Sequence, residues 1–186
     1  MEKVILPKEL DNEVKEKLNQ YEKETSKKVE VKFILFGEID NKEKNIIIKD
    51  WLFLSHATIK DSSFMLEDSL YDVKKDGNCL KILPKDNLKV KKIEKKHKEK
   101  LKLYERIGVL HSHPIRRCEL KNKYNECNPS LSCYSDADIR ASLLLYVLQS
   151  NKRNKKPLIH VLYCQPEDKY LALKFPGKKL IDVIVK

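Results

Sequence analysis

Two histidines, His111 and His113, end an apolar stretch that begins at Ile107. The stretch predicts a buried strand, and because side chains alternate between the two faces of a strand, both imidazoles point to the same side. Two imidazoles at this spacing suit a single metal ion. His-x-His pairs are common, however, so the pair alone does not distinguish a metal site from an ordinary strand end.

A second polar pair opens the apolar helix that is predicted from Ser135 to about residue 150. Ser135 and Asp138 are three residues apart and therefore share one face of that helix. If the helix start packs against the strand end, Asp138 adds a third ligand, and two histidines with one carboxylate and an open position describe a catalytic zinc site. The alternative is a capping arrangement, in which both side chains satisfy the helix N-terminus.

The order of these pieces resembles the JAMM (MPN+) family of zinc metalloproteases, which includes deubiquitinases. The order is an apolar strand, His-x-His-Pro, a loop, Ser-x-x-Asp and an apolar helix. The family motif adds a glutamate upstream, seven residues before a glycine, and Glu30 stands seven residues before Gly37. The resemblance covers roughly residues 28–150.

The resemblance implies a hydrolase of the isopeptidase type, acting on the amide bond between the C-terminus of a ubiquitin-like protein and a target amine. It implies one catalytic Zn²⁺ with His111, His113 and Asp138 as ligands. It also implies that Glu30 is the general base and that Ser135 donates a hydrogen bond to the oxyanion. A small peptide or a sulfur-carrier conjugate is the second substrate class.

An insertion of about 20 residues, 115–134, separates the motif proline from Ser135, where the family usually has about seven residues. It contains Cys118, Cys127 and Cys133. The three thiols could hold a second, structural zinc with one more ligand, or form one disulfide and leave one thiol, or belong to a plain loop. Because it adjoins the predicted site, the insertion is also a natural place for substrate selection.

Hydrophobic periodicity predicts the elements that must position these residues. The expected helices span about 7–26, 84–105 and 135–150, and the expected strands 29–36, 45–55, 106–113, 158–164, 170–175 and 179–185. Two short strands, 63–66 and 79–83, are expected around the turn at 76–78. This pattern predicts one α/β domain, residues 1–186, with a mixed, largely antiparallel sheet flanked by helices. That architecture agrees with the JAMM fold that the resemblance implies.

The chain is strongly basic, with 39 Lys and Arg against 28 Asp and Glu and a formal net charge of +11. Solvated lysine-rich helix faces explain such an excess, and so does an acidic partner such as nucleic acid or an acidic ubiquitin-like protein. The basic run at 84–105 has no aromatic residue before Tyr104, which does not favour base readout. The alternative function is therefore a non-catalytic or nucleic-acid-associated MPN-type protein that uses its lysine-rich surface.

No apolar run approaches the length of a transmembrane helix, and the short apolar start is not a signal peptide. Five cysteines with irregular spacing argue against a secreted disulfide scaffold. The expectation is a cytoplasmic protein without a membrane partner. The oligomeric state is left open.

Overall fold

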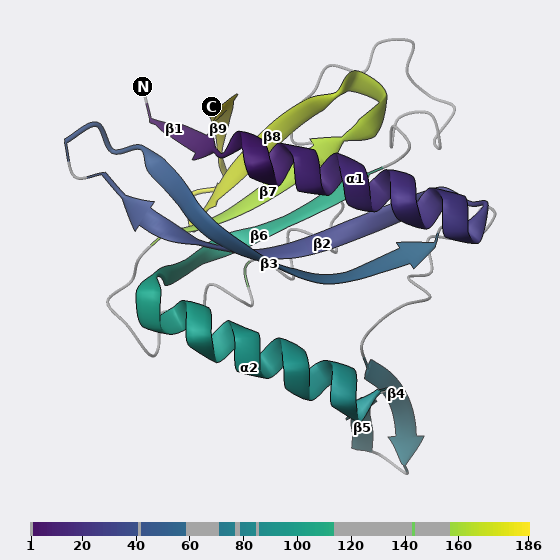
Figure 1. Cartoon of the computed structure of the whole chain (residues 1–186). Helices are drawn as coiled ribbons and strands as arrows, with labels where there is room; N and C mark the ends of the chain where they lie inside the picture. Colours follow the sequence, from purple (N-terminus) through teal and green to yellow (C-terminus); the bar gives the residue numbers. More distant parts are fainter. Residues whose placement is uncertain are drawn as a thin grey trace.

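The computed structural model describes residues 2–40, 42–58, 71–76, 79–84, 86–113, 143 and 157–186. In these residues the fold is mixed α/β, with two α-helices and a seven-stranded mixed sheet that closes into a barrel (Figure 1). A separate two-stranded hairpin stands beside the barrel.

The elements follow in chain order. They are β1 (Lys3–Leu6), α1 (Lys8–Thr25), β2 (Val29–Ile39), β3 (Ile46–Thr58), β4 (Tyr71–Asp76), β5 (Cys79–Pro84), α2 (Asn87–Leu103), β6 (Glu105–His113), β7 (Leu158–Cys164), a 3₁₀ turn (Gln165–Glu167), β8 (Lys169–Phe175) and β9 (Lys179–Val185). The strand order around the barrel is β1-β3-β2-β6-β7-β8-β9, and β1 pairs with β9 to close it. Four of these pairings are antiparallel and three are parallel.

The first helix, α1, lies across one face of the sheet (Figure 1). Leu10, Val14 and Leu18 recur at helical spacing and are buried. They join a core cluster with the odd-numbered residues of β2, among them Val31 and Phe33. One face of β2 is therefore packed against α1, and its even-numbered residues face away from that helix.

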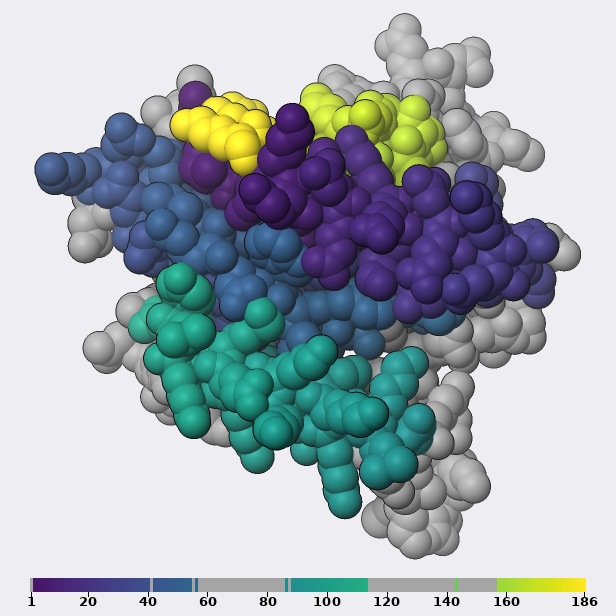
Figure 2. Space-filling view, in the orientation of Figure 1, coloured from purple at the N-terminus to yellow at the C-terminus, as the bar shows by residue number. Residues whose placement is uncertain are grey.

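The second helix, α2, covers part of the opposite face. Asp86 caps it, since its Oδ1 accepts hydrogen bonds from the backbone N–H groups of residues 88 and 89 at 2.9 and 3.0 Å. Ile93 and Leu101 pack against the cluster formed by Ile34 and Phe36. Most lysines of α2 are exposed, and long side chains project from the helix in Figure 2, whereas Lys100 is half-buried and pairs with Asp50 of β3.

The sequence-based expectation of a mixed sheet with helices is confirmed, with two differences in detail. The strand Lys3–Leu6 was not expected, and it closes the barrel by pairing in parallel with β3 and β9. The first arm of the hairpin is Tyr71–Asp76, whereas the strand expected at 63–66 lies outside the described residues.

The helix expected from Ser135 lies almost wholly outside the described residues as well. Leu143 is described, and it is helical and packs against the cluster of Leu158 and Leu162. No helix in the described part of the chain is long and apolar enough to cross a membrane.

Candidate metal centre

The antiparallel pairing of β2 with β6 brings Glu30 to the histidines. Lys32 pairs with His111, and because the strands are antiparallel, Glu30, two residues before Lys32, lies opposite His113, two residues after His111. The Oε1 atom of Glu30 is 4.0 Å from Nε2 of His113. The side chains of Glu30 and His113 are only 12% and 16% exposed, so the carboxylate and the imidazole are close together and largely shielded from water.

The two motif histidines converge through the same ring nitrogen. Nε2 of His111 and Nε2 of His113 are 2.8 Å apart, and the ring centroids are 4.6 Å apart. Zn–N bonds of about 2.0–2.1 Å at a tetrahedral angle would place the two nitrogens about 3.3 Å apart. If the two Nε2 atoms moved about half an ångström further apart, both imidazoles could bind one metal ion. His111 and His113 therefore fit the zinc ion that the resemblance implies.

His111 is kept in its neutral form. Its side chain is almost fully buried, and burial, with the neighbouring His160 and His113 and the charge of Lys32, holds the pKa of His111 well below its usual value. A neutral imidazole is the form that offers a lone pair to a metal. The surroundings of His111 thus favour the protonation state that a ligand needs.

The serine between the two histidines points to the other face and fixes the strands. Ser112 is completely buried, and its Oγ accepts a hydrogen bond from the backbone N–H of Val31 at 3.0 Å. Val31 directly follows Glu30 in the chain. This contact therefore sets the position of β2 relative to β6 at the level of the candidate site.

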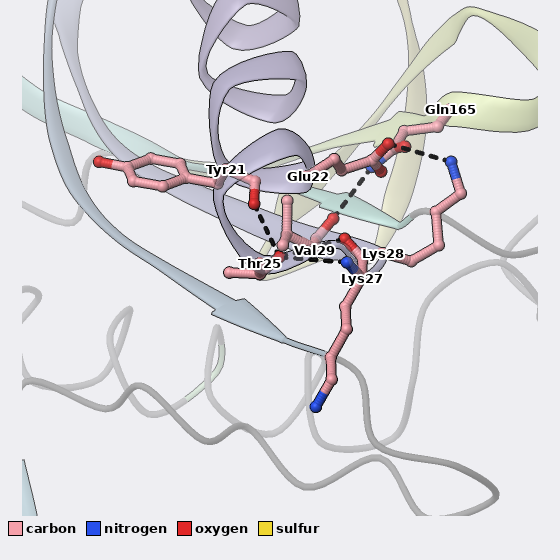
Figure 3. A network of polar contacts seen from close by, with 7 residues as sticks. All are labelled: Tyr21, Glu22, Thr25, Lys27, Lys28, Val29 and Gln165. Atoms are coloured by element: carbon pink, nitrogen blue, oxygen red, sulfur yellow. Dashed lines mark hydrogen bonds and ion pairs between the residues drawn. The ribbon is translucent and has the colours of Figure 1, made fainter.

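A polar network fixes the start of β2, one residue before Glu30 (Figure 3). The Lys28 ammonium group, directly before β2, donates to the Glu22 carboxylate of α1 at 3.1 Å. The side-chain amide of Gln165, directly after β7, donates to the carbonyl oxygen of Val29 at 3.1 Å. The segment that carries Glu30 is thereby tied both to α1 and to the end of β7.

The candidate site lies on the face of the sheet that points away from α1. On that face, Ile34 and Phe36 belong to one apolar cluster and Leu162 belongs to another. His111 and Glu30 are polar positions on the same strand faces as these residues. Polar side chains at a largely buried position between apolar clusters are a common setting for chemistry.

Of the residues that the sequence singles out, the structure brings Glu30, His111 and His113 together. Ser135 and Asp138 lie outside the described residues, and so does the insertion with its three cysteines, Cys118, Cys127 and Cys133. Within the described ranges, no group of three or more His, Cys, Asp or Glu side chains could hold a metal ion. A complete site would therefore need a donor from elsewhere in the chain.

One residue of this cluster, His160, was not predicted from the sequence. Nε2 of His160 is 2.6 Å from Nδ1 of His111. The one signal in the sequence is that His160 interrupts an otherwise apolar strand, Leu158–Cys164, in which every residue is buried. A buried polar side chain requires a partner, and that requirement marks His160 as a candidate for a specific contact.

Comparison of the chain with models of known protein families gave no match, and a search of curated proteins gave none either.

Proposed function

We propose that this chain is a zinc-dependent metallo-isopeptidase of the JAMM (MPN+) type. The observation that carries the proposal is the convergence of His111 and His113 through their Nε2 atoms, 2.8 Å apart, with Glu30 Oε1 4.0 Å from His113. Two histidines that can bind one metal ion, with a carboxylate beside them, are the arrangement that the sequence motif requires. The barrel topology is compatible with the JAMM fold, which is itself part of the proposal.

His111, His113 and Asp138 would hold the ion. Support for the third ligand comes from Leu143, which lies five residues after Asp138 in the chain and packs in helical conformation against the cluster that contains Leu162. Leu162 lies on the same face of β7 as His160, the neighbour of His111. When bound, Zn²⁺ supplies Lewis acidity, which lowers the pKa of a water ligand to about 7 and polarises a carbonyl oxygen.

Glu30 is the general base of the proposed mechanism. Its carboxylate would accept a proton from the attacking water and pass it to the leaving amine. A general base needs to reach the proton directly or through one water, and the 4.0 Å separation of Glu30 Oε1 from Nε2 of His113 supports this role. Ser135 would donate a hydrogen bond to the oxyanion of the tetrahedral intermediate.

The proposed substrate is an amide bond between the C-terminus of a ubiquitin-like protein and a target amine, in the cytoplasm. This part of the proposal comes from the family resemblance. The excess of positive charge, +11, is compatible with an acidic partner protein. The second candidate, a nucleic-acid-associated protein, is supported by the exposed lysines of α2.

Glu30→Gln tests the enzyme directly. Because the amide keeps the size of the side chain and removes the base, we expect zinc content to be retained and cleavage of a ubiquitin-like conjugate to fall by at least ~10²-fold. His113→Ala should lose both zinc and cleavage. The matched control is Glu38→Gln, an exposed glutamate on the same strand, which should change neither.

The zinc content of the same samples, measured by elemental analysis, also decides the role of the insertion. One zinc per chain in wild type that persists in Cys118→Ser/Cys127→Ser would leave the insertion as a loop. A second zinc that disappears in this double variant would identify a structural site. Wild-type protein that takes up no zinc after metal reconstitution would contradict the metalloprotease proposal.

A further inference from the structure

His160 lies on the strand next to the one that carries the two motif histidines. Strands β6 and β7 are parallel, and Val109 pairs with His160 while His111 pairs with Leu162. Paired residues share a face of the sheet, and so do residues two apart on one strand. His160 and His111 are therefore diagonal neighbours on the face that carries the candidate metal centre.

The two imidazoles make a close and almost fully buried contact. Nε2 of His160 is 2.6 Å from Nδ1 of His111, and each histidine is 4% exposed. A hydrogen bond between two ring nitrogens needs one N–H donor and one lone-pair acceptor. The contact therefore couples the tautomer of one ring to the tautomer of the other.

The other nitrogen of His111 decides which way this hydrogen bond runs. Nε2 of His111 points at Nε2 of His113, where the metal would be shared. A lone pair at that position requires the proton of neutral His111 to be on Nδ1, which then donates to Nε2 of His160. His160 must in turn carry its own proton on Nδ1.

We propose that His160 is a positioning residue that fixes the tautomer and ring orientation of His111, so that the Nε2 lone pair of His111 is presented to the metal. The inference rests on the proposed metal site. Histidines that bind a metal usually donate their second N–H to a carboxylate, a backbone carbonyl or water. Loss of that acceptor typically lowers metal affinity by about 10- to 100-fold. Here the acceptor is the Nε2 atom of an imidazole from the adjacent strand.

The first test is the ring tautomer of His111 in metal-free protein, read from two-dimensional NMR spectra of protein labelled with ¹⁵N-histidine. Wild type should show His111 protonated at Nδ1. In His160→Leu, which removes the acceptor and keeps an apolar side chain of similar size, the signal should shift toward protonation at Nε2. In His160→Gln, the amide oxygen can accept the same hydrogen bond, and the Nδ1-protonated form should persist.

The second test is the zinc affinity of the same proteins, by competition with a chromogenic chelator. We expect His160→Leu to weaken zinc binding by about 10- to 100-fold and His160→Gln to stay within a few-fold of wild type. His97→Leu is the matched control, because it replaces a half-buried histidine packed against Phe36 in the same way, and it should leave zinc affinity unchanged.

The outcomes separate this inference from the proposed function. Wild-type zinc affinity and an unchanged His111 tautomer in His160→Leu would overturn the positioning role while the metal site stands. Equal loss of affinity in His160→Leu and His160→Gln, with no tautomer change, would also overturn it. A wild type that binds no zinc contradicts the metal site, and the tautomer measurement on metal-free protein then still decides whether His160 controls His111.

Discussion

At the scale of single residues, the sequence Leu110-His111-Ser112-His113 has two separate tasks. The histidines face the candidate metal centre, and the serine between them faces the opposite side of the strand, toward the core under α1. The Oγ atom of Ser112 accepts a hydrogen bond from the backbone N–H of Val31, next to Glu30. Ser112 has no role in the proposed reaction, but its hydrogen bond holds the strand with the proposed base next to the strand with the proposed ligands.

Ser112→Ala should therefore destabilise the protein and disturb the site together. Removing the hydroxyl leaves a buried N–H of Val31 without this acceptor, which costs about 1–3 kcal/mol in unfolding free energy. Urea unfolding monitored by circular dichroism measures that loss. Ser112→Cys keeps the approximate volume and a weak acceptor, so it should fall between wild type and Ser112→Ala. Equal stability of all three proteins would show that the hydrogen bond does not fix β2.

At the scale of elements, the site depends on three adjacent strands, β2, β6 and β7, and β6 approaches β7 closely at a glycine. Gly108 in β6 pairs with Leu35 of β2 on one side and with Ile159 of β7 on the other. A Cβ atom on Gly108 would lie 2.0 Å from the backbone oxygen of Ile159, far inside van der Waals contact. Only glycine allows β6 and β7 to approach in this way, and the same pairing brings His160 to His111.

Gly108→Ala should separate β6 from β7 and so act on both stability and metal binding. We expect a destabilisation at or above the ~1–3 kcal/mol that is typical of overpacking, together with weaker zinc binding. Gly177→Ala is the matched control, because a Cβ there meets nothing within 4 Å. Thermal unfolding gives the stability and chelator competition gives the affinity. A Gly108→Ala protein as stable as the control would contradict the close approach of the strands.

The strands also show which contacts of the site can be predicted from the sequence and which cannot. His111 and His113 could be placed on one face from the sequence, because alternation along a strand is a local signal. Glu30 could be selected because its spacing to Gly37 is part of the family motif. The contact of His160 with His111 joins residues 49 positions apart and depends on the register of two parallel strands. Local periodicity does not determine that register. For the same reason, the pairing of β1 with β9 that closes the barrel could not be predicted from the sequence.

At the scale of the whole molecule, charge is distributed unevenly over the fold. Helix α2 contains eight lysines and two glutamates, a formal charge of 8 − 2 = +6 out of the chain's +11. Its apolar stripe packs against β2 and β3, which leaves most of the lysines exposed. A groove of about 860 Å³ runs between α2 and β3, and Lys92, Lys96 and Trp51 are among the residues that line it. Aromatic side chains that are distant from the lysines in the sequence thus lie beside them in the fold.

This surface should bind polyanions in a manner that depends on salt and not on the candidate metal centre. For a single-stranded RNA, each neutralised phosphate contributes about 0.7 to the slope of log affinity against log salt concentration. Lys92→Ala/Lys96→Ala should therefore lower the slope by ~1.4 in fluorescence-anisotropy titrations. The control, Lys169→Ala/Lys178→Ala, makes an equal change of charge at exposed lysines in and beyond β8 and should leave the slope nearly unchanged. Glu30→Gln should bind as wild type does. If both double variants lower the slope equally, the attraction comes from net charge alone, and the surface of α2 has no special part in it.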